Sequence, residues 1–181
     1  FLRLAQSIVE SPDFKPDRVG IWMQCFAPPL EDQDMQEAVA VRLRPLMRKA
    51  FRGNADEETY QRYIDYALKQ WRSGKGFTDS MKAALAAILS SPRFLYLYQE
   101  ASLETTLEDA SLKGLELASR LSFFLWGSLP DEPLLEAALN GELVLDQGLE
   151  KQFHRMLSHP RLKRFCDSFP SQWLQLDRII S

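Results

Sequence analysis

Apolar residues recur at helical spacing along most of the chain, and this pattern predicts an all-α fold. The stripe at i, i+3, i+4, i+7 and i+8 that a core-facing helix presents is occupied by Leu43, Leu46, Met47, Ala50 and Phe51. Similar stripes run through 60–71, 81–89 and 149–157. We therefore expect about eight helices in two packed helical subdomains, preceded by an irregular N-terminal segment.

Capping residues and breakers indicate where the helices begin and end. Gly53 is placed to end the first long helix in the left-handed conformation. Pro45 predicts a kink or a break within that helix, because proline lacks an N–H and crowds the preceding turn. The side chains that would accept hydrogen bonds from free N–H groups at a helix start are Asn54, Thr78, Asp131 and Asp146.

The chain is expected to divide into three parts. Residues 1–34 form the irregular N-terminal segment, which holds the end of an amphipathic helix and, at 19–23, at most one short strand. A small helical domain follows at 35–100. A polar, acidic stretch at 100–111 then leads into a second helical domain, 109–181, which we expect to be truncated at its C-terminal end.

The helix that ends at Trp126 is apolar on nearly all sides and is expected to form the centre of the second core. Arg120 lies inside it, and a buried arginine needs a partner, for which Asp131 and Glu116 are both candidates. We interpret Arg120, Trp126, Asp131 and a further tryptophan, Trp173, as structural residues.

One sequence pattern occurs twice. Residues 89–94 are Leu-Ser-Ser-Pro-Arg-Phe, and residues 157–162 are Leu-Ser-His-Pro-Arg-Leu. In each, the proline is placed to begin a new helix after a corner. Two independent uses of one joint are favoured over an internal duplication.

The composition is that of an ordinary folded chain and excludes several classes of protein. The 181 residues include 22 Lys+Arg and 25 Asp+Glu, for a formal net charge of −3, and 45% are hydrophobic. This balance argues against extensive disorder and against a nucleic-acid binder. Two cysteines and two histidines are too few for a multi-ligand zinc framework, and no apolar run approaches the ~20 residues of a membrane span. The sequence also holds no phosphate-binding glycine loop and no serine nucleophile motif.

Two sets of residues leave alternatives open. Cys25 and Cys166 either pair in an oxidising compartment or remain buried free thiols, and the second is favoured. The basic residues of 42–52 alternate with core positions, so a solvated face is the default interpretation. The alternative is an acidic partner bound at Arg42, Arg44 and Arg48.

The stretch 116–131, Glu-Leu-Ala-Ser-Arg-Leu-Ser-Phe-Phe-Leu-Trp-Gly-Ser-Leu-Pro-Asp, resembles the signature of a helical domain of unknown function in the planctomycete-type multidomain cytochrome c-like proteins. Upstream, 87–96 is similar to the small helical domain that precedes it in those proteins. The chain departs from that family in two places. It has Arg-Gly-Asn at 52–54 where the family usually has Arg-Arg-Pro, and it lacks a cysteine often found after the Cys25 position.

The resemblance implies a setting rather than an activity. Such proteins look like large exported bacterial proteins with c-type haem in separate modules, which implies a periplasmic or extracellular location, an electron-transfer setting, and neighbouring domains of the same polypeptide as partners. This chain has no Cys-x-x-Cys-His motif, so no cofactor is expected within it. C-type haem is expected only in modules that are missing from this chain. His154 and Met156 are candidates for a ligand that reaches such a haem, although a solvated histidine and a core methionine are favoured.

The leading hypothesis is a non-catalytic helical scaffold that positions neighbouring domains of a larger exported, haem-associated protein. One alternative is a contribution to an oxidoreductase active site formed with missing haem modules. Another is a partner-binding module that uses the basic helix 42–52. Whether the whole protein is an enzyme stays open, because this chain carries no catalytic motif.

Overall fold

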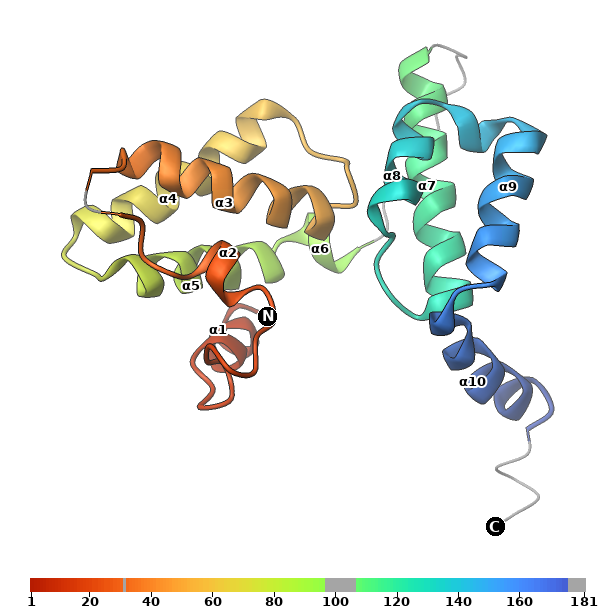
Figure 1. Cartoon of the computed structure of the whole chain (residues 1–181), viewed down its shortest axis with the longest axis horizontal. Helices are drawn as coiled ribbons and strands as arrows, with labels where there is room; N and C mark the ends of the chain where they lie inside the picture. The colour runs from red at the N-terminus through yellow and green to blue at the C-terminus, as the bar shows by residue number, and fades with distance from the viewer. Residues whose placement is uncertain (31, 97–106, 176–181) are drawn as a thin grey trace. The chain divides into compact units, whose positions relative to one another are not determined.

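A computed structural model describes residues 1–30, 32–96 and 107–175, with side chains for all of these except 107–110. Within these ranges every regular element is a helix, which confirms the all-α prediction (Figure 1). No helix of the described part combines the length and apolar character needed to cross a bilayer. The chain divides into two compact units, unit 1 (Phe1–Leu97) and unit 2 (Tyr98–Ser181). The predicted boundary at 100–111 lies largely outside the described residues and stays a prediction.

Unit 1 is built around one helix that contacts most of the others. Its helices are α1 (Leu2–Val9), α2 (Trp22–Cys25), α3 (Met35–Ala50), α4 (Glu57–Arg72), α5 (Phe77–Leu89) and α6 (Pro92–Leu95). α5 packs against α1, α3, α4 and α6. Its buried face joins the predicted stripe of α3 in one hydrophobic core, whose wholly buried large side chains are Phe26, Phe51, Leu43, Met47, Ile64, Met81 and Ile88.

The N-terminal segment begins with the amphipathic helix that the sequence predicted, α1. α1 packs on α5 and buries Ala5 and Val9 in the core of unit 1. No strand forms at 19–23, where at most one was expected, because the chain turns there into the short helix α2. That turn lets Phe14 and Trp22 pack their rings against the buried Phe26, at centroid distances of 5.2 and 5.4 Å. Aromatic burial outweighs the local preference for an extended segment.

Two expected features of α3 and α4 differ from the structure. α3 continues through Pro45 as one helix, so the predicted break is wrong, while the alternative that was predicted, a kink, stays a prediction. Pro45 and Val41 are both exposed, and water can satisfy the Val41 carbonyl that proline leaves without a donor. α4 is capped by Asp56, whose carboxylate accepts from the Thr59 N–H at 2.8 Å, and not by Asn54. Gly53 is left-handed, with φ 78°, as predicted.

The start of α5 is also different. Its N-cap is Gly76, which has no side chain to accept a hydrogen bond, so the expected Thr78 cap is wrong. The Thr78 hydroxyl instead donates to the Phe26 carbonyl at 2.8 Å. This long-range hydrogen bond ties α5 to the end of α2, which local sequence cannot indicate.

Unit 2 is built around the longest helix. Its helices are α7 (Leu107–Trp126), α8 (Glu132–Leu139), α9 (Asp146–Leu157) and α10 (Lys163–Trp173), with short 3₁₀ helices η1 (Glu142–Val144) and η2 (Pro160–Leu162). α7 packs against α8, η1, η2 and α10. Gly114 permits the close approach of α8, because a Cβ there would lie 2.7 Å from the Ala138 carbonyl oxygen.

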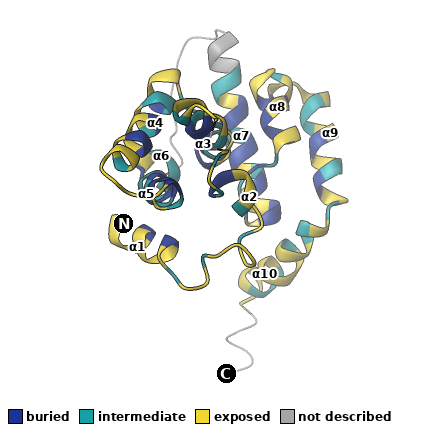
Figure 2. Ribbon diagram, turned by 60° about the vertical axis from the view of Figure 1, so that its left-hand side comes forward, coloured by how far each residue is buried: buried dark blue, intermediate teal, exposed yellow. Residues whose placement is uncertain are grey.

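The helices of unit 2 contribute unequally to its core. Figure 2 shows buried residues along α7 and α8, whereas α10 is largely exposed and buries none of its residues. The expected cap at Asp146 is wrong, because Asp146 is the first residue of α9 and Leu145 occupies the N-cap position. The core of unit 2 consists of Leu115, Ala118, Leu125, Trp126, Leu134, Leu135, Ala137, Ala138, Leu143 and Met156.

Candidate functional site

Trp126 lies at the centre of a polar cluster in unit 2. It is the last residue of α7, and its side chain is wholly buried. Its indole Nε1–H donates to the Met156 carbonyl at 3.2 Å, which ties the end of α7 to the end of α9. Gly127, with φ 57°, then turns the chain away from the helix.

Asp131 and Arg155 form a two-bonded ion pair beside this tryptophan. Asp131 caps α8 as predicted, accepting from the Leu134 N–H at 3.2 Å. Its two oxygens also accept from Arg155 Nη1 and Nη2 at 2.7 and 2.9 Å, and Arg155 Nε donates to Gln152 at 2.7 Å. Each of the three guanidinium nitrogens of Arg155 therefore donates a hydrogen bond, either to the cap of α8 or to a side chain of α9.

The charge of Asp131 is held by its surroundings. Burial alone would raise the pKa of Asp131, but the Arg155 hydrogen bonds and charge, the Leu134 N–H and nearby Arg161 together hold it below the ordinary value. A carboxyl group with a lowered pKa stays ionised near neutral pH, which is the opposite of what a general acid requires. This arrangement therefore favours a structural role for Asp131.

Two guanidinium groups and one imidazole ring lie around the Trp126 indole. The Arg155 and Arg161 guanidinium carbons lie 5.6 and 5.3 Å from its ring centroid, at cation–π distance. The His159 ring centroid lies 4.7 Å from it, and His159 Nδ1 accepts from the Arg161 N–H at 3.1 Å. We call Trp126, Asp131, Arg155, His159 and Arg161 the Trp126 cluster.

The structure brings together two of the four predicted structural residues, Trp126 and Asp131. Arg120 is not in the cluster: its side chain is 57% exposed and pairs with Glu116, one of the two candidate partners. The expectation that Arg120 is buried is wrong, because α7 is not covered on all sides. Trp173 is 72% exposed near the end of α10.

The two candidates for a haem ligand lie in different surroundings on α9. Met156 is wholly buried in the core of unit 2, so its thioether does not fit a group outside this unit. His154 is exposed, with Nε2 3.6 Å from a Glu150 carboxylate oxygen. In the part of the chain that the structure describes, no three His, Cys, Asp or Glu side chains gather as metal ligands.

The cysteines are both free thiols. Cys25 is buried, and burial raises the pKa of its thiol despite the nearby positive charge of Arg42. Cys166 is exposed on α10, so the prediction of two buried thiols is wrong for this residue. Its exposure follows from the uncovered position of α10.

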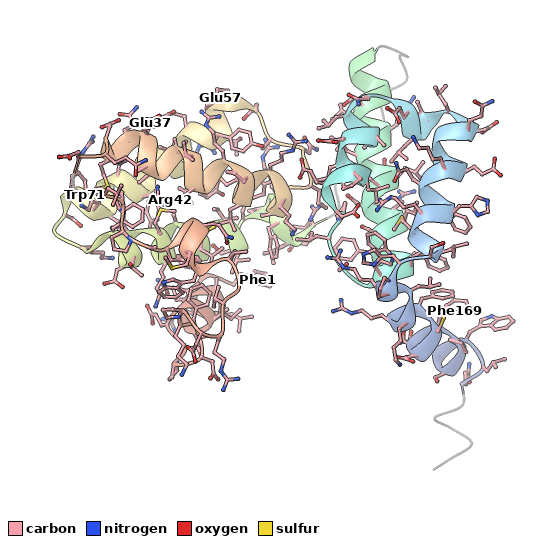
Figure 3. All side chains as sticks on the ribbon, in the orientation of Figure 1. Phe1, Glu37, Arg42, Glu57, Trp71 and Phe169 are labelled. Carbon is pink, nitrogen blue, oxygen red and sulfur yellow. The ribbon has the colours of Figure 1, made fainter. Side chains whose placement is uncertain are left out.

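The basic face of α3 is partly used within unit 1. Arg44 forms a two-bonded ion pair with Glu57, in which Nη1 and Oε2 are 2.8 Å apart. Arg42 donates to the Ala38 carbonyl at 2.9 Å and lies 5.4 Å from the Phe77 ring centroid. Figure 3 labels both Arg42 and Glu57 on the ribbon of this unit. The acidic partner predicted at Arg42, Arg44 and Arg48 is not indicated by these contacts and stays a prediction.

Sequence reasoning missed Arg155 as the partner of Asp131. The two residues are 24 positions apart, so no helical or turn spacing connects them. Arg161 is different, because it belongs to the twice-used Pro-Arg joint that the sequence did single out. The repeated pattern was therefore a signal for part of the Trp126 cluster, although it did not reveal the tryptophan contact.

The fold and the cluster define a chain of two all-α modules with a structural ion-pair network. Residues 29–99 match the family model described as PSD5, a protein of unknown function (DUF1595). Residues 112–181 match the model described as PSD4, a protein of unknown function (DUF1592). No curated protein and no solved structure matches the chain.

Proposed function

We propose that this chain is a non-catalytic helical scaffold module of a larger exported protein that carries c-type haem in other modules. In this proposal the chain packs against neighbouring domains of the same polypeptide and positions them. The two matches to domains of unknown function are consistent with a non-catalytic module. The exported, periplasmic or extracellular location and the electron-transfer setting rest only on the resemblance of 116–131 and 87–96 to that family.

One observation carries the packing role: an uncovered aromatic face on α10. Phe165, Phe169 and Trp173 follow one another at i, i+4 spacing, and their rings stack at centroid distances of 4.7 and 6.1 Å. Phe124 of α7 extends the row, with its ring 5.0 Å from that of Phe165. We call these four residues the α10 aromatic face, on which Figure 3 labels Phe169.

This face exposes far more apolar surface than one isolated side chain. Trp173 and Phe124 are 72% and 56% exposed, and α10 buries none of its residues. Contiguous exposed apolar surface on a folded domain marks a site of interaction. Stacked aromatic rings favour a protein surface because they offer large contact area at little cost in conformational entropy.

The proposal is tested by hydroxyl-radical footprinting of the 181-residue chain and of the whole polypeptide that contains it. Trp173 and Phe169 are expected to be oxidised readily in the chain alone and several-fold less in the whole polypeptide, where a neighbouring domain covers them. Met23, which is 74% exposed in unit 1, serves as the control residue and is expected to react equally in both.

Equal reactivity of Trp173 in both samples would show that nothing covers the α10 aromatic face and would contradict the scaffold role. The haem setting has a separate readout, a Soret absorption band of the whole polypeptide. The two alternative functions, an oxidoreductase site shared with haem modules and a partner-binding basic helix, stay predictions without a contact that favours them.

A further inference from the structure

Three arginines of the described part of unit 2 lie around Trp126. Arg155 and Arg161 lie over the indole, and Arg164 Nη1 donates to the Trp126 carbonyl at 3.4 Å. The printed contacts of the described residues place one carboxylate beside these arginines, that of Asp131, and both of its oxygens accept from Arg155. Three guanidinium groups and one carboxylate leave an excess of two positive charges.

Arg161 and Arg164 carry this excess. Among the described residues neither forms an ion pair, whereas Arg120, Arg155 and Lys163 of the same unit all do. Arg161 is half-buried and Arg164 is exposed, so both can be reached from solvent. Unpaired arginines that are held in place near a protein surface are suited to recognise an oxyanion.

The side chains of these two arginines are held by contacts with Trp126. The Arg161 guanidinium lies against the indole, while the backbone N–H of Arg161 donates to His159 Nδ1 and fixes the backbone at this position. Arg164 is fixed by its bond to the Trp126 carbonyl. Because His159 Nδ1 accepts a hydrogen bond, its neutral ring carries its proton on Nε2, which provides a further donor. Preorganised donors lose less conformational entropy when a ligand binds.

We infer that Arg161 and Arg164, assisted by the His159 Nε2–H, bind a phosphate group. A phosphate dianion matches the excess of two positive charges, and its oxygens can accept from two guanidinium groups at once. This site is separate from the scaffold role, because it needs no neighbouring domain. The phosphate has two sources to be distinguished, a soluble phosphate and a phospholipid headgroup beside the α10 aromatic face.

The test uses the full 181-residue chain and follows the indole N–H resonances by NMR. The Trp126 signal is assigned by elimination with Trp22→Phe, Trp71→Phe and Trp173→Phe. Inorganic phosphate is titrated against sodium chloride at constant ionic strength, and a saturable shift of the Trp126 signal is expected. Arg161→Gln and Arg164→Gln are each expected to weaken this binding about tenfold, as loss of one charge-assisted hydrogen bond predicts.

Arg120→Gln is the matched control, because it removes an arginine of the same unit that is already paired with Glu116. It is expected to leave phosphate binding unchanged. A shift that is absent, that does not saturate, or that persists in both the Arg161→Gln and Arg164→Gln variants overturns the site. Retained indole dispersion in each variant shows that unit 2 is still folded.

Sedimentation with vesicles distinguishes the two sources. Binding to phosphatidylcholine vesicles that contain phosphatidic acid, whose phosphomonoester can carry two negative charges, supports the site with a lipid headgroup as its ligand when inorganic phosphate competes with it. A phosphate response without vesicle binding supports the site with a soluble phosphate. Vesicle binding without any phosphate response overturns the site, because the α10 aromatic face would then account for it.

Discussion

The helix joints at Ser91-Pro92 in unit 1 and His159-Pro160 in unit 2 share a sequence pattern and a local conformation. Ser91 Oγ accepts from the Arg93 N–H at 3.3 Å, and His159 Nδ1 accepts from the Arg161 N–H at 3.1 Å. The two capping residues have ψ angles of 138° and 140°. In both joints proline begins the next helix, as its fixed φ favours.

Different residues hold the two joints in their units. In unit 1 the buried Arg52 donates to the carbonyl oxygens of residues 93, 94 and 96 at 2.7 to 3.1 Å. In unit 2 the joint is secured by the Trp126 ring, against which His159 and Arg161 pack. The comparison teaches that a short pattern sets the corner itself, while a residue from elsewhere in the chain sets its tertiary position.

The largest effect is expected from removing the Arg52 guanidinium. Arg52→Met keeps most of the apolar stem but leaves three carbonyl oxygens without their charged donor, so unit 1 should lose about 3 kcal/mol of stability. Burial lowers the pKa of the Arg52 guanidinium, which indicates a real desolvation cost that these hydrogen bonds offset. Urea unfolding measures the loss, and faster amide exchange in α6 locates it.

Arg62→Met is the control for this prediction, because Arg62 is exposed on α4 and forms an exposed ion pair with Glu58 of the same helix. It should change stability by less than about 0.5 kcal/mol. If Arg52→Met behaves like this control, the joint of unit 1 does not depend on the guanidinium, and the proposed difference between the joints is lost.

A smaller effect is expected from Asp131→Asn in unit 2. Asparagine keeps the N-cap of α8, so the substitution removes mainly the ion pair with the half-buried Arg155. The loss should be about 1–2 kcal/mol near neutral pH. Asp167→Asn, which removes an exposed pair with Lys163, is the control and should cost little.

The Asp131 contribution should also depend on pH in a defined direction. Because its folded-state pKa is lowered, the unfolded chain binds a proton in a range where the folded chain does not. The stabilisation is therefore complete above the ordinary carboxyl pKa of about 4 and is lost as the pH falls below it toward the folded value. Unfolding curves of the native chain and the Asp131→Asn variant should converge in acid. A constant difference down to low pH would contradict the ion-pair assignment.

The same distinction explains what the sequence could and could not predict. Helical periodicity is local, so the all-α fold, the left-handed Gly53 and the Asp131 cap were predicted correctly. The Arg120 environment was not, because an apolar pattern does not reveal which sides of α7 a neighbour covers. Phe124, for example, stays largely exposed on that helix.

Errors at helix starts have a related cause. Asn54 and Asp56 are two positions apart and both have side chains suited to an N-cap, so local pattern does not discriminate between them. The structure selects Asp56, while the Asn54 carbonyl accepts from Arg93 Nη1 at 3.3 Å. That long-range contact with the joint of unit 1 depends on packing, as the Arg155–Asp131 pair of unit 2 does.

The smallest effects come from exchanging the capping residues of the two joints. Ser91→Ala removes a cap and should cost about 1 kcal/mol. In unit 2, His159→Ser introduces the capping residue that unit 1 uses, so it keeps a cap but loses the ring contact with Trp126. His159→Ala loses both the cap and the ring contact. The stability difference between His159→Ser and His159→Ala therefore isolates the cap. It should equal the cost of Ser91→Ala within a few tenths of a kcal/mol, since both joints share the same backbone geometry. If serine and alanine at position 159 are equally destabilising, then the Trp126 contact alone holds the second joint, and the common pattern would not reflect a common cap.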